Sequence, residues 1–365
     1  MTIFENALLG ERYRRGGLLP KLLPVQEVVR DRLIGASPDP AAWEAADCLC
    51  GAAGGRVLSE VDRHGLPYRK VLCTRCGLMR VTPRWNQVRY ARFYKTEYRD
   101  LYSPLRDGDL RKTLHDLSTG PGALLVGDFV MQAWRRHGRP ELDRPVIVEI
   151  GAGGGWNLSR LPARWHRIGY DFDERFLTLG REVFGVDMRR GFFDESLEAV
   201  ATADCVLISH VLEHVADPVS VLRRLCDAAR ADTLILVEVP GIFRLHKTSV
   251  DPMRYWQNAH TYTFCARTAI DTCLRAGLQP VAADEWIRLV LKPSRRCNTV
   301  PSDDPALAQS VERYLRFCEG VRKASDAVLG VPAAARLVRR TSDALVRAVE
   351  SIGLLHGVNA GRLKG

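Results

Sequence analysis

The sequence predicts an α/β fold built on a mostly parallel sheet. Between residues 146 and 293, short apolar runs such as VIVEI, HRIGYD, DCVLIS and TLILVEV alternate with segments of helical periodicity. This alternation is typical of βαβ units, whose crossover helices cover both faces of a parallel sheet. The last two runs, LQPVAAD and IRLVLK, follow each other closely and predict an antiparallel hairpin at one edge.

The composition is that of a folded globular protein. The 365 residues are 46% hydrophobic and 26% charged, and no apolar run approaches the roughly 18 residues of a membrane span. The first residues lack the pattern of an export signal, so we expect a cytoplasmic protein. The formal charge of +10 predicts attraction to anions, which include nucleic acid, acidic lipid headgroups and nucleotide-linked substrates.

A glycine-rich turn follows the VIVEI run and opens a helix. Its sequence, GAGGGWNLSRL, places Gly151, Gly153 and Gly155 at the first, third and fifth positions. A dinucleotide-binding loop requires glycine at the sixth position, which is Trp156 here, so NAD is disfavoured. Glu149 ends the preceding strand, where a buried carboxylate needs a partner such as a ligand ammonium.

This stretch resembles motif I of class I S-adenosylmethionine (SAM)-dependent methyltransferases, in which an acidic residue and a GxGxG loop hold the amino acid end of SAM. The resemblance covers residues 146–293 and implies a Rossmann-like domain with a mostly parallel seven-stranded sheet. It also implies SAM as the cofactor. Asp171, at the end of the second strand, takes the place of the carboxylate that binds the ribose hydroxyls, with Asp173 as the alternative. Asp194 or backbone groups after the third strand are the candidate contacts for adenine.

The fourth strand leads into SHVLEHVADP, which places His210 at the carboxyl end of a strand, where ligands of open α/β sheets bind. His210, Glu213 and His214 also match the H-x-x-E-H pattern of inverted zinc peptidases. The phrase resembles the LEH element of methyltransferases more closely. We therefore interpret Glu213 and His214 as packing and hydrogen-bonding residues at the start of the next helix.

Another candidate catalytic histidine lies in the segment DPMRYWQNAHTYTF, after the fifth strand. This phrase resembles a segment of methyltransferases from sugar and polysaccharide pathways, in which a histidine acts near the acceptor, and His260 takes that place. In the sugar C-methyltransferases a glutamate precedes this histidine, but here Ala259 does, which favours transfer to oxygen. A hydroxyl acceptor must lose its proton, so we expect His260 as the first candidate base, His210 as the second, and Tyr262 beside the acceptor.

Two close cysteine pairs predict a structural zinc site. Cys48 and Cys50 are separated by 22 residues from Cys73 and Cys76, and a glycine follows each pair. Four thiolates can close tetrahedrally on zinc, and the glycines permit the tight turns between ligands. A closed four-cysteine site leaves no position for water, so its role would be structural.

The cysteine pairs and the aromatic run that follows resemble the N-terminal zinc-binding part of sugar C-methyltransferases from deoxysugar pathways. We divide the chain accordingly into an N-terminal leader at 1–45 with a helix around 25–33, a zinc-binding module at 46–82, a helical bridging region at 83–145, the SAM-binding domain at 146–295 and a C-terminal helical region at 296–365.

Three functions are compatible with these features. The first is methyl transfer to a hydroxyl of a sugar, glycan precursor or related small metabolite. The second is an RNA base methyltransferase, because positive charge and basic aromatic stretches suit stacking on bases. The third is a SAM-binding scaffold subunit, whose C-terminal helices would contact a membrane surface or a dimer partner.

Overall fold

The computed structural model describes residues 4–6, 8–15, 22–37, 39–102, 109–245, 250–296 and 302–328. These residues belong to two compact units. The first contains residues 1–90 and 240–268 together with the helix that begins at Pro305, and the second contains residues 91–239 and 269–300. The helix predicted after residue 328 lies outside the described residues. No helix among the described residues is long and apolar enough to cross a membrane.

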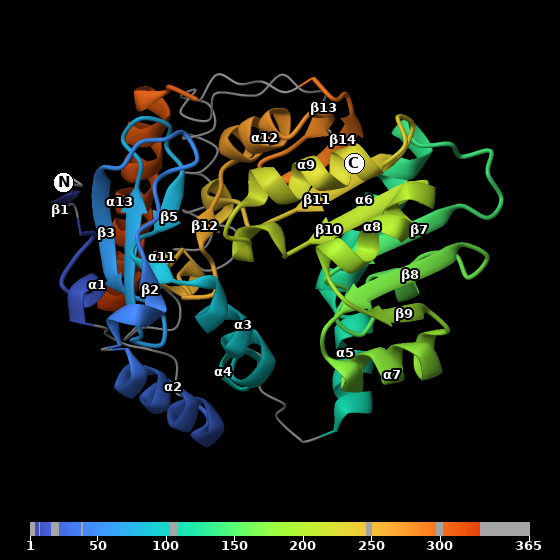
Figure 1. Cartoon of the computed structure of the whole chain (residues 1–365). Helices are drawn as coiled ribbons and strands as arrows, with labels where there is room; N and C mark the ends of the chain where they lie inside the picture. Colours follow the sequence, from blue (N-terminus) through green and yellow to red (C-terminus); the bar gives the residue numbers. More distant parts are fainter. Residues whose placement is uncertain are drawn as a thin grey trace. The chain divides into compact units, whose positions relative to one another are not determined.

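The second unit contains the predicted α/β sheet (Figure 1). Its seven strands have the order β13-β14-β11-β10-β7-β8-β9, and β14 runs opposite to the other six. The predicted hairpin is confirmed, with β14 inserted between β13 and β11. The strands are β7 (Val146–Ile150), β8 (His166–Asp171), β9 (Asp187–Arg190), β10 (Cys205–Ser209), β11 (Leu234–Glu238), β13 (Leu278–Ala283) and β14 (Arg288–Pro293).

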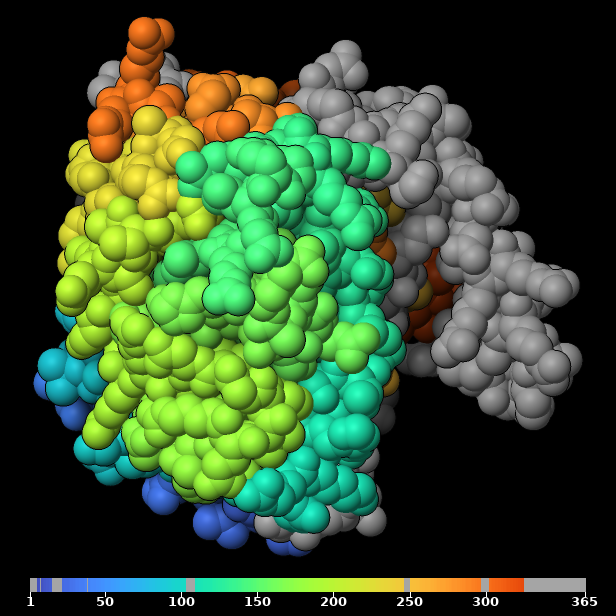
Figure 2. Space-filling view, turned by 90° about the vertical axis from the view of Figure 1, so that its right-hand side faces the viewer, coloured from blue at the N-terminus to red at the C-terminus, as the bar shows by residue number. Residues whose placement is uncertain are grey.

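Helices of the second unit begin and end at residues suited to those positions. The side chain of Asp173 caps α7, which ends at Gly185 in the left-handed conformation. Asp217 caps α9, with Pro218 in its first turn. On the face in Figure 2, the green and yellow-green segments of this unit form one continuous surface. The helices are α3 (Gln87–Thr96), α4 (Tyr98–Tyr102), α5 (Leu110–Thr119), α6 (Pro121–His137), α7 (Glu174–Phe184), α8 (Phe193–Thr202), α9 (Pro218–Ala228) and α12 (Ala266–Arg275), of which α3 and α12 cross the boundary with the first unit.

The first unit is built on a five-stranded sheet of order β1-β3-β4-β5-β12. All neighbours in it are antiparallel except β1 and β3. A separate two-stranded ladder joins β2 (Trp43–Glu44) to β6 (Arg84–Trp85). The strands of the main sheet are β1 (Phe4–Asn6), β3 (Gly55–Val61), β4 (Pro67–Leu72), β5 (Met79–Val81) and β12 (Tyr262–Thr263).

Three stretches of sequence build the core of the first unit. The core includes Tyr13, Trp256 and Leu315, one from each stretch. The Tyr13 hydroxyl donates to Glu319 at 2.6 Å, which ties the first stretch to α13. The helix expected around residues 25–33 is present as α2. The helices are α1 (Arg12–Arg15), α2 (Pro24–Ala36), α11 (Pro252–Tyr255) and α13 (Pro305–Val328).

Candidate active site

The glycine turn after β7 has a backbone that requires glycine. Gly151, Gly153 and Gly155 have φ angles of 75°, 57° and 78°, in the left-handed region. A Cβ atom on Gly153 would overlap the indole ring of Trp156. The turn is fixed to the neighbouring strand, because the amides of Gly151 and Ala152 both donate to the Tyr170 carbonyl at 2.9 Å.

Glu149 is a fully buried carboxyl group beside this turn. Its Oε1 accepts a hydrogen bond from the Asn157 side chain at 2.7 Å, whereas Oε2 has no partner among the described residues. Burial raises the pKa of Glu149 to about 8; the Asn157 hydrogen bond opposes this, and the charges of Asp171 and Glu238 add to it. A ligand ammonium would supply the missing partner and favour the ionised form.

Asp171 shapes the turn from the end of β8. Its Oδ2 accepts from the Gly153 amide at 2.8 Å, and its Oδ1 accepts from the Phe172 amide at 2.8 Å. Arg99 of α4 lies nearby, with Nη2 3.7 Å from Asp171 Oδ1 and Nε 2.6 Å from Asp173 Oδ2. Sequence analysis missed Arg99, because one arginine in a basic aromatic stretch carries no positional signal.

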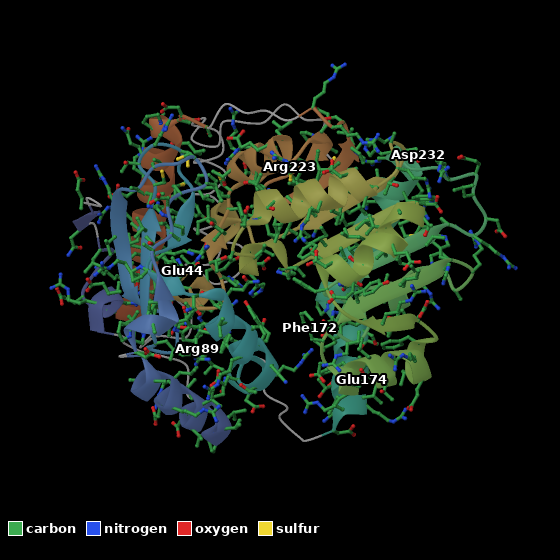
Figure 3. All side chains as sticks on the ribbon, in the orientation of Figure 1. Glu44, Arg89, Phe172, Glu174, Arg223 and Asp232 are labelled. Carbon is green, nitrogen blue, oxygen red and sulfur yellow. The ribbon has the colours of Figure 1, made fainter. Side chains whose placement is uncertain are left out.

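Two aromatic rings flank the carboxyl ends of β8 and β9. Phe172, labelled in Figure 3, is 56% exposed, and its ring centroid lies 5.4 Å from that of Phe192. Asp194, the expected adenine contact, lies in the first turn of α8 and forms an ion pair with Arg224 of α9. Its role toward adenine stays a prediction, and the exposed Phe172 ring is a further candidate that sequence analysis did not name.

His210 follows β10 in a left-handed conformation, with a φ of 54° that is uncommon outside glycine. Its side chain is 59% exposed, and its Nδ1 lies 3.4 Å from Oε1 of Glu213, which is buried. Desolvation lowers the pKa of His210, but the adjacent Glu213 carboxylate outweighs it, so the pKa is raised above the ordinary value. The Glu213 pKa is lowered: burial raises it, but the two neighbouring histidines outweigh that effect.

His214 lies on the other side of Glu213. Its Nε2 is 3.9 Å from Glu213 Oε1, and its Nδ1 is 3.0 Å from the Tyr94 hydroxyl of α3. The rings of Tyr94 and Tyr98 each meet the imidazole edge-on at 5.9 Å. Residues 212–214 form one 3-10 turn instead of the helix that an H-x-x-E-H zinc site requires.

His260 and Tyr262 belong to the first unit, whereas His210 and the candidate cofactor residues belong to the second. The His260 side chain is buried and contacts the Gln257 amide group, and its carbonyl accepts from Lys70 Nζ at 3.4 Å. The Tyr262 hydroxyl lies 3.4 Å from Arg84 Nη1. Their catalytic roles stay predictions.

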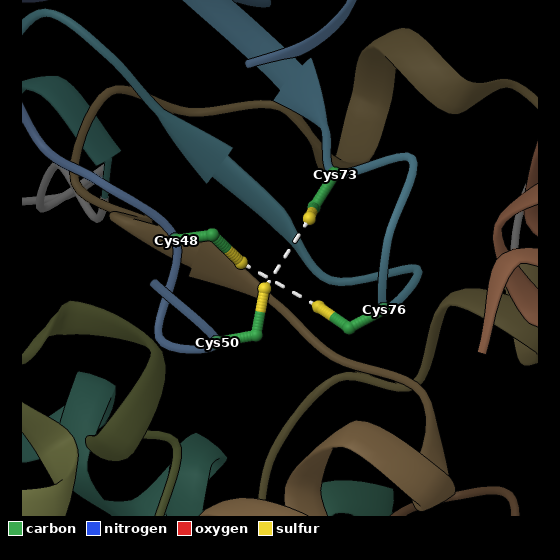
Figure 4. Close-up of side chains that lie close together, drawn as sticks. All are labelled: Cys48, Cys50, Cys73 and Cys76. Carbon is green, nitrogen blue, oxygen red and sulfur yellow. Dashed lines mark hydrogen bonds between the residues drawn. The ribbon is translucent and has the colours of Figure 1, made fainter. Parts of the chain in front are cut away.

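The structure brings the four predicted cysteines together, all of them buried (Figure 4). Sγ of Cys48 is 3.5 Å from that of Cys76, and Sγ of Cys50 is 3.6 Å from that of Cys73. The four sulfurs lie within 4.8 Å of one another. Zinc–sulfur bonds of about 2.3 Å imply tetrahedral edges of about 3.8 Å, so these spacings fit one zinc ion.

Each cysteine pair is followed by a glycine in the left-handed region. Gly51 has a φ of 83° and donates to the Cys48 carbonyl, and Gly77 has a φ of 76° and donates to the Cys73 carbonyl. The two turns therefore close alike, although one residue separates the first pair and two separate the second. The spacing does not prevent convergence of the sulfurs.

Comparison with known proteins identifies the family. A model of the methyltransferase domain matches residues 90–283, which is more than half of the chain. The chain therefore belongs to this family of methyltransferase domains. It is an enzyme, a SAM-dependent methyltransferase with the class I Rossmann-like fold. No curated protein sequence matches the chain.

The chain is also similar to parts of solved methyltransferase structures. One is a chain from the complex between the Haloferax volcanii Trm112 methyltransferase activator and a methyltransferase, with 14% identity over 50% of this chain and 97% of that one, and a TM-score of 0.37. Human N-acetylserotonin methyltransferase bound to SAM has 14% identity over 52% and 56%, with a TM-score of 0.39. A SAM-dependent methyltransferase from Thermotoga maritima has 15% identity over 51% and 97%, with a TM-score of 0.36.

Proposed function

We propose that the enzyme transfers the methyl group of SAM to a hydroxyl of a sugar, glycan precursor or related small metabolite, with a histidine as base. The observation that carries this proposal is the His210–Glu213 pair. Transfer to a hydroxyl requires removal of a proton as the methyl group moves, and an imidazole beside a carboxylate is suited to that task. The rest of the catalysis is alignment of donor and acceptor.

We place His210 first of the two candidate bases because it follows the strand next to the one that leads into the glycine turn. Strands β7 and β10 are neighbours, with Ile150 paired to Ile208, so Gly151 and His210 both follow the same end of adjacent strands. Ligands of open α/β sheets bind at this end. His260 is the second candidate, because its imidazole is buried against Gln257.

Glu149 and Asp171 are the residues that we propose for SAM itself. The unpartnered Oε2 of Glu149 suits the ammonium of the methionine moiety, and the Asp171 carboxylate suits the ribose hydroxyls. Bound SAM supplies an electrophilic methyl group on a sulfonium. A bulky residue in place of Gly153 should abolish S-adenosylhomocysteine binding in calorimetry, and unchanged affinity would refute this site.

The test of the base uses purified full-length protein and labelled SAM. Release of S-adenosylhomocysteine is measured with nucleotide sugars, free sugars and glycans, and with RNA as the competing class of acceptor. Turnover on RNA alone would refute the sugar proposal and support the RNA alternative. With an acceptor found, His210→Ala should reduce kcat at least about 100-fold and leave S-adenosylhomocysteine affinity unchanged. Full activity of His210→Ala, with loss in His260→Ala, would assign the base to His260.

We also propose that Cys48, Cys50, Cys73 and Cys76 bind one structural zinc ion. The sulfur spacing, complete burial and paired glycine turns support this assignment. Four thiolate ligands fill a tetrahedral shell, so the ion would stabilise the loops and take no part in methyl transfer. A thiolate cluster also explains why four buried thiols converge without forming disulfides.

A further inference from the structure

We propose that His214 and Tyr94 are positioning residues of the active site. They orient the Glu213 carboxylate and reduce the extent to which it stabilises the protonated form of His210. The inference deepens the proposed function, because it rests on His210 as the base. It assigns a task to two residues that sequence analysis treated as packing or as part of a bridging helix.

The contacts connect α3, the 3-10 turn at residues 212–214 and the residue that follows β10. The Tyr94 hydroxyl of α3 lies 3.0 Å from Nδ1 of His214. On the opposite side of that ring, Nε2 lies 3.9 Å from Oε1 of Glu213. The same oxygen is 3.4 Å from Nδ1 of His210. One carboxylate oxygen therefore lies within 4 Å of both imidazoles.

From this arrangement we expect one tautomer for each imidazole. A carboxylate accepts hydrogen bonds, so the nitrogen that each imidazole turns toward Glu213 carries a proton. His214 is then protonated at Nε2 and accepts the Tyr94 hydroxyl proton at Nδ1. His210 is protonated at Nδ1, which leaves its lone pair on Nε2. That nitrogen is the one available to an acceptor hydroxyl.

Sharing the carboxylate has a chemical consequence. A base must be unprotonated at the working pH, and a buried carboxylate beside an imidazole stabilises the protonated form. A second donor on the same oxygen withdraws part of that stabilisation from His210. The Tyr94 hydroxyl assists, because a donor at Nδ1 of His214 makes its Nε2–H a stronger donor to Glu213.

Among the described residues of this unit, one further charged group acts on His210. Glu238, in the neighbouring strand β11, contributes a smaller charge effect in the same direction as Glu213. Its carboxylate already accepts from the Ser209 hydroxyl at 2.9 Å and lies 3.2 Å from Nε of Arg288. Glu213 is therefore the carboxylate whose sharing matters most.

The first experiment needs no acceptor. The full-length protein is labelled with ¹⁵N-histidine, the imidazoles are titrated by NMR, and the His210 signals are assigned from their absence in His210→Gln. We expect the Nδ1–H tautomer for His210 and the Nε2–H tautomer for His214. Glu213→Gln should lower the pKa of His210, whereas His214→Ala should raise it.

Matched variants separate charge sharing from simple packing. Gln in place of His214 retains a donor to Glu213, so His214→Gln should return the His210 pKa toward that of the wild type. Tyr94→Phe should raise it by less than His214→Ala does. Tyr102→Phe, in the same aromatic cluster as Tyr98, should leave it unchanged. The proposal is overturned if His214→Ala and Tyr94→Phe leave the His210 pKa and tautomer as in the wild type.

Once an acceptor is known, the pH profile of kcat provides a second test of the His210 pKa. His214→Ala should move the acidic limb to higher pH, so activity lost at neutral pH returns in more alkaline buffer. A merely structural loss would lower kcat at every pH and would overturn the inference. Failure of the base assignment is distinct: His210→Ala would then retain activity whatever the other variants show.

Discussion

The two units differ in how their sheets are drawn from the sequence. In the second unit, β7 to β11 follow one another along the chain, and β8, β9 and β10 lead into α7, α8 and α9, whereas β7 leads into a short 3-10 turn instead of the predicted helix. In the first unit, β5 pairs with β12, and the whole of β7 to β11 lies between them in the sequence. The comparison shows that local periodicity in the sequence predicts the sheet of the second unit. The sheet of the first unit forms by pairing of strands that are far apart in the sequence, beside cysteines that converge from two separate segments.

The largest expected effect concerns the cysteine cluster of the first unit. Cys76→Ala should abolish zinc binding and the thermal unfolding transition of this unit, because structural zinc contributes on the order of 10 kcal/mol to folding. Metal analysis and calorimetry measure both. S-adenosylhomocysteine binding should persist, since the cofactor residues belong to the second unit. Its joint loss would show that the two units do not fold separately.

Glu149 gives the second unit a pH dependence of its own. Its folded-state pKa of about 8 lies above the ordinary value of 4.5, so only the unfolded state ionises in between. Stability should therefore fall as pH rises from about 4.5 to 8 and level off above, at roughly 1.4 kcal/mol per unit of pKa difference.

Denaturant unfolding at pH 5 and pH 8.5 measures this effect. Glu149→Gln should remove the slope and make the protein more stable than the wild type at the higher pH. The same variant should bind S-adenosylhomocysteine more weakly, because an ammonium loses its carboxylate. An identical slope in both proteins would contradict the assignment.

Arg80 stabilises the loops that precede β3 in the first unit. Its buried guanidinium donates to the carbonyls of Ala46, Ala53 and Gly54. Arg80→Leu should reduce the free energy of unfolding by about 3 kcal/mol, because it leaves buried carbonyls without donors. Denaturant unfolding measures this loss. The neighbouring exposed Arg69→Leu is the control, with an expected change below about 0.5 kcal/mol; equal effects would refute the role of Arg80.

The smallest expected effect concerns the proposed contact between Phe172 and the adenine of the cofactor. Phe172→Ala should weaken S-adenosylhomocysteine binding by about 1 kcal/mol, the typical value of one aromatic stacking contact, with no change in stability. Calorimetric titration measures it, and exposed Val183→Ala on α7 is the control. If both variants bind alike, the adenine contact lies elsewhere.

The sequence predicted the second unit's fold because its signals are local. Apolar runs and the glycine turn each lie within a few residues, and the turn at Gly151 to Gly155 has the left-handed backbone that its glycines imply. The cysteine convergence was also accessible, since the glycine after each pair marks a tight turn. The apolar periodicity and the glycine turns can both be recognised in the sequence without knowledge of long-range contacts.

The parts that escaped prediction depend on side chains far apart in the sequence. Tyr94 and His214 are 120 residues apart, and the local sequence around either residue does not predict their contact. Arg99 meets Asp173 only because α4 lies against the end of β8. The two residues of β12 are too few for a strand pattern, so their place beside β5 could not be inferred from periodicity.

The pairing of β12 with β5 also determines when during synthesis the sheet of the first unit can be completed. Ribosomes add about 5–20 residues per second, and the whole methyltransferase sheet from β7 to β11 is synthesised before Tyr262 and Thr263 exist. Until then the β5 edge lacks its final partner, and α13 is still to be made. An unpaired strand edge invites association with other chains. Nascent protein should therefore be prone to association through the β5 edge until β12 is made and pairs with it.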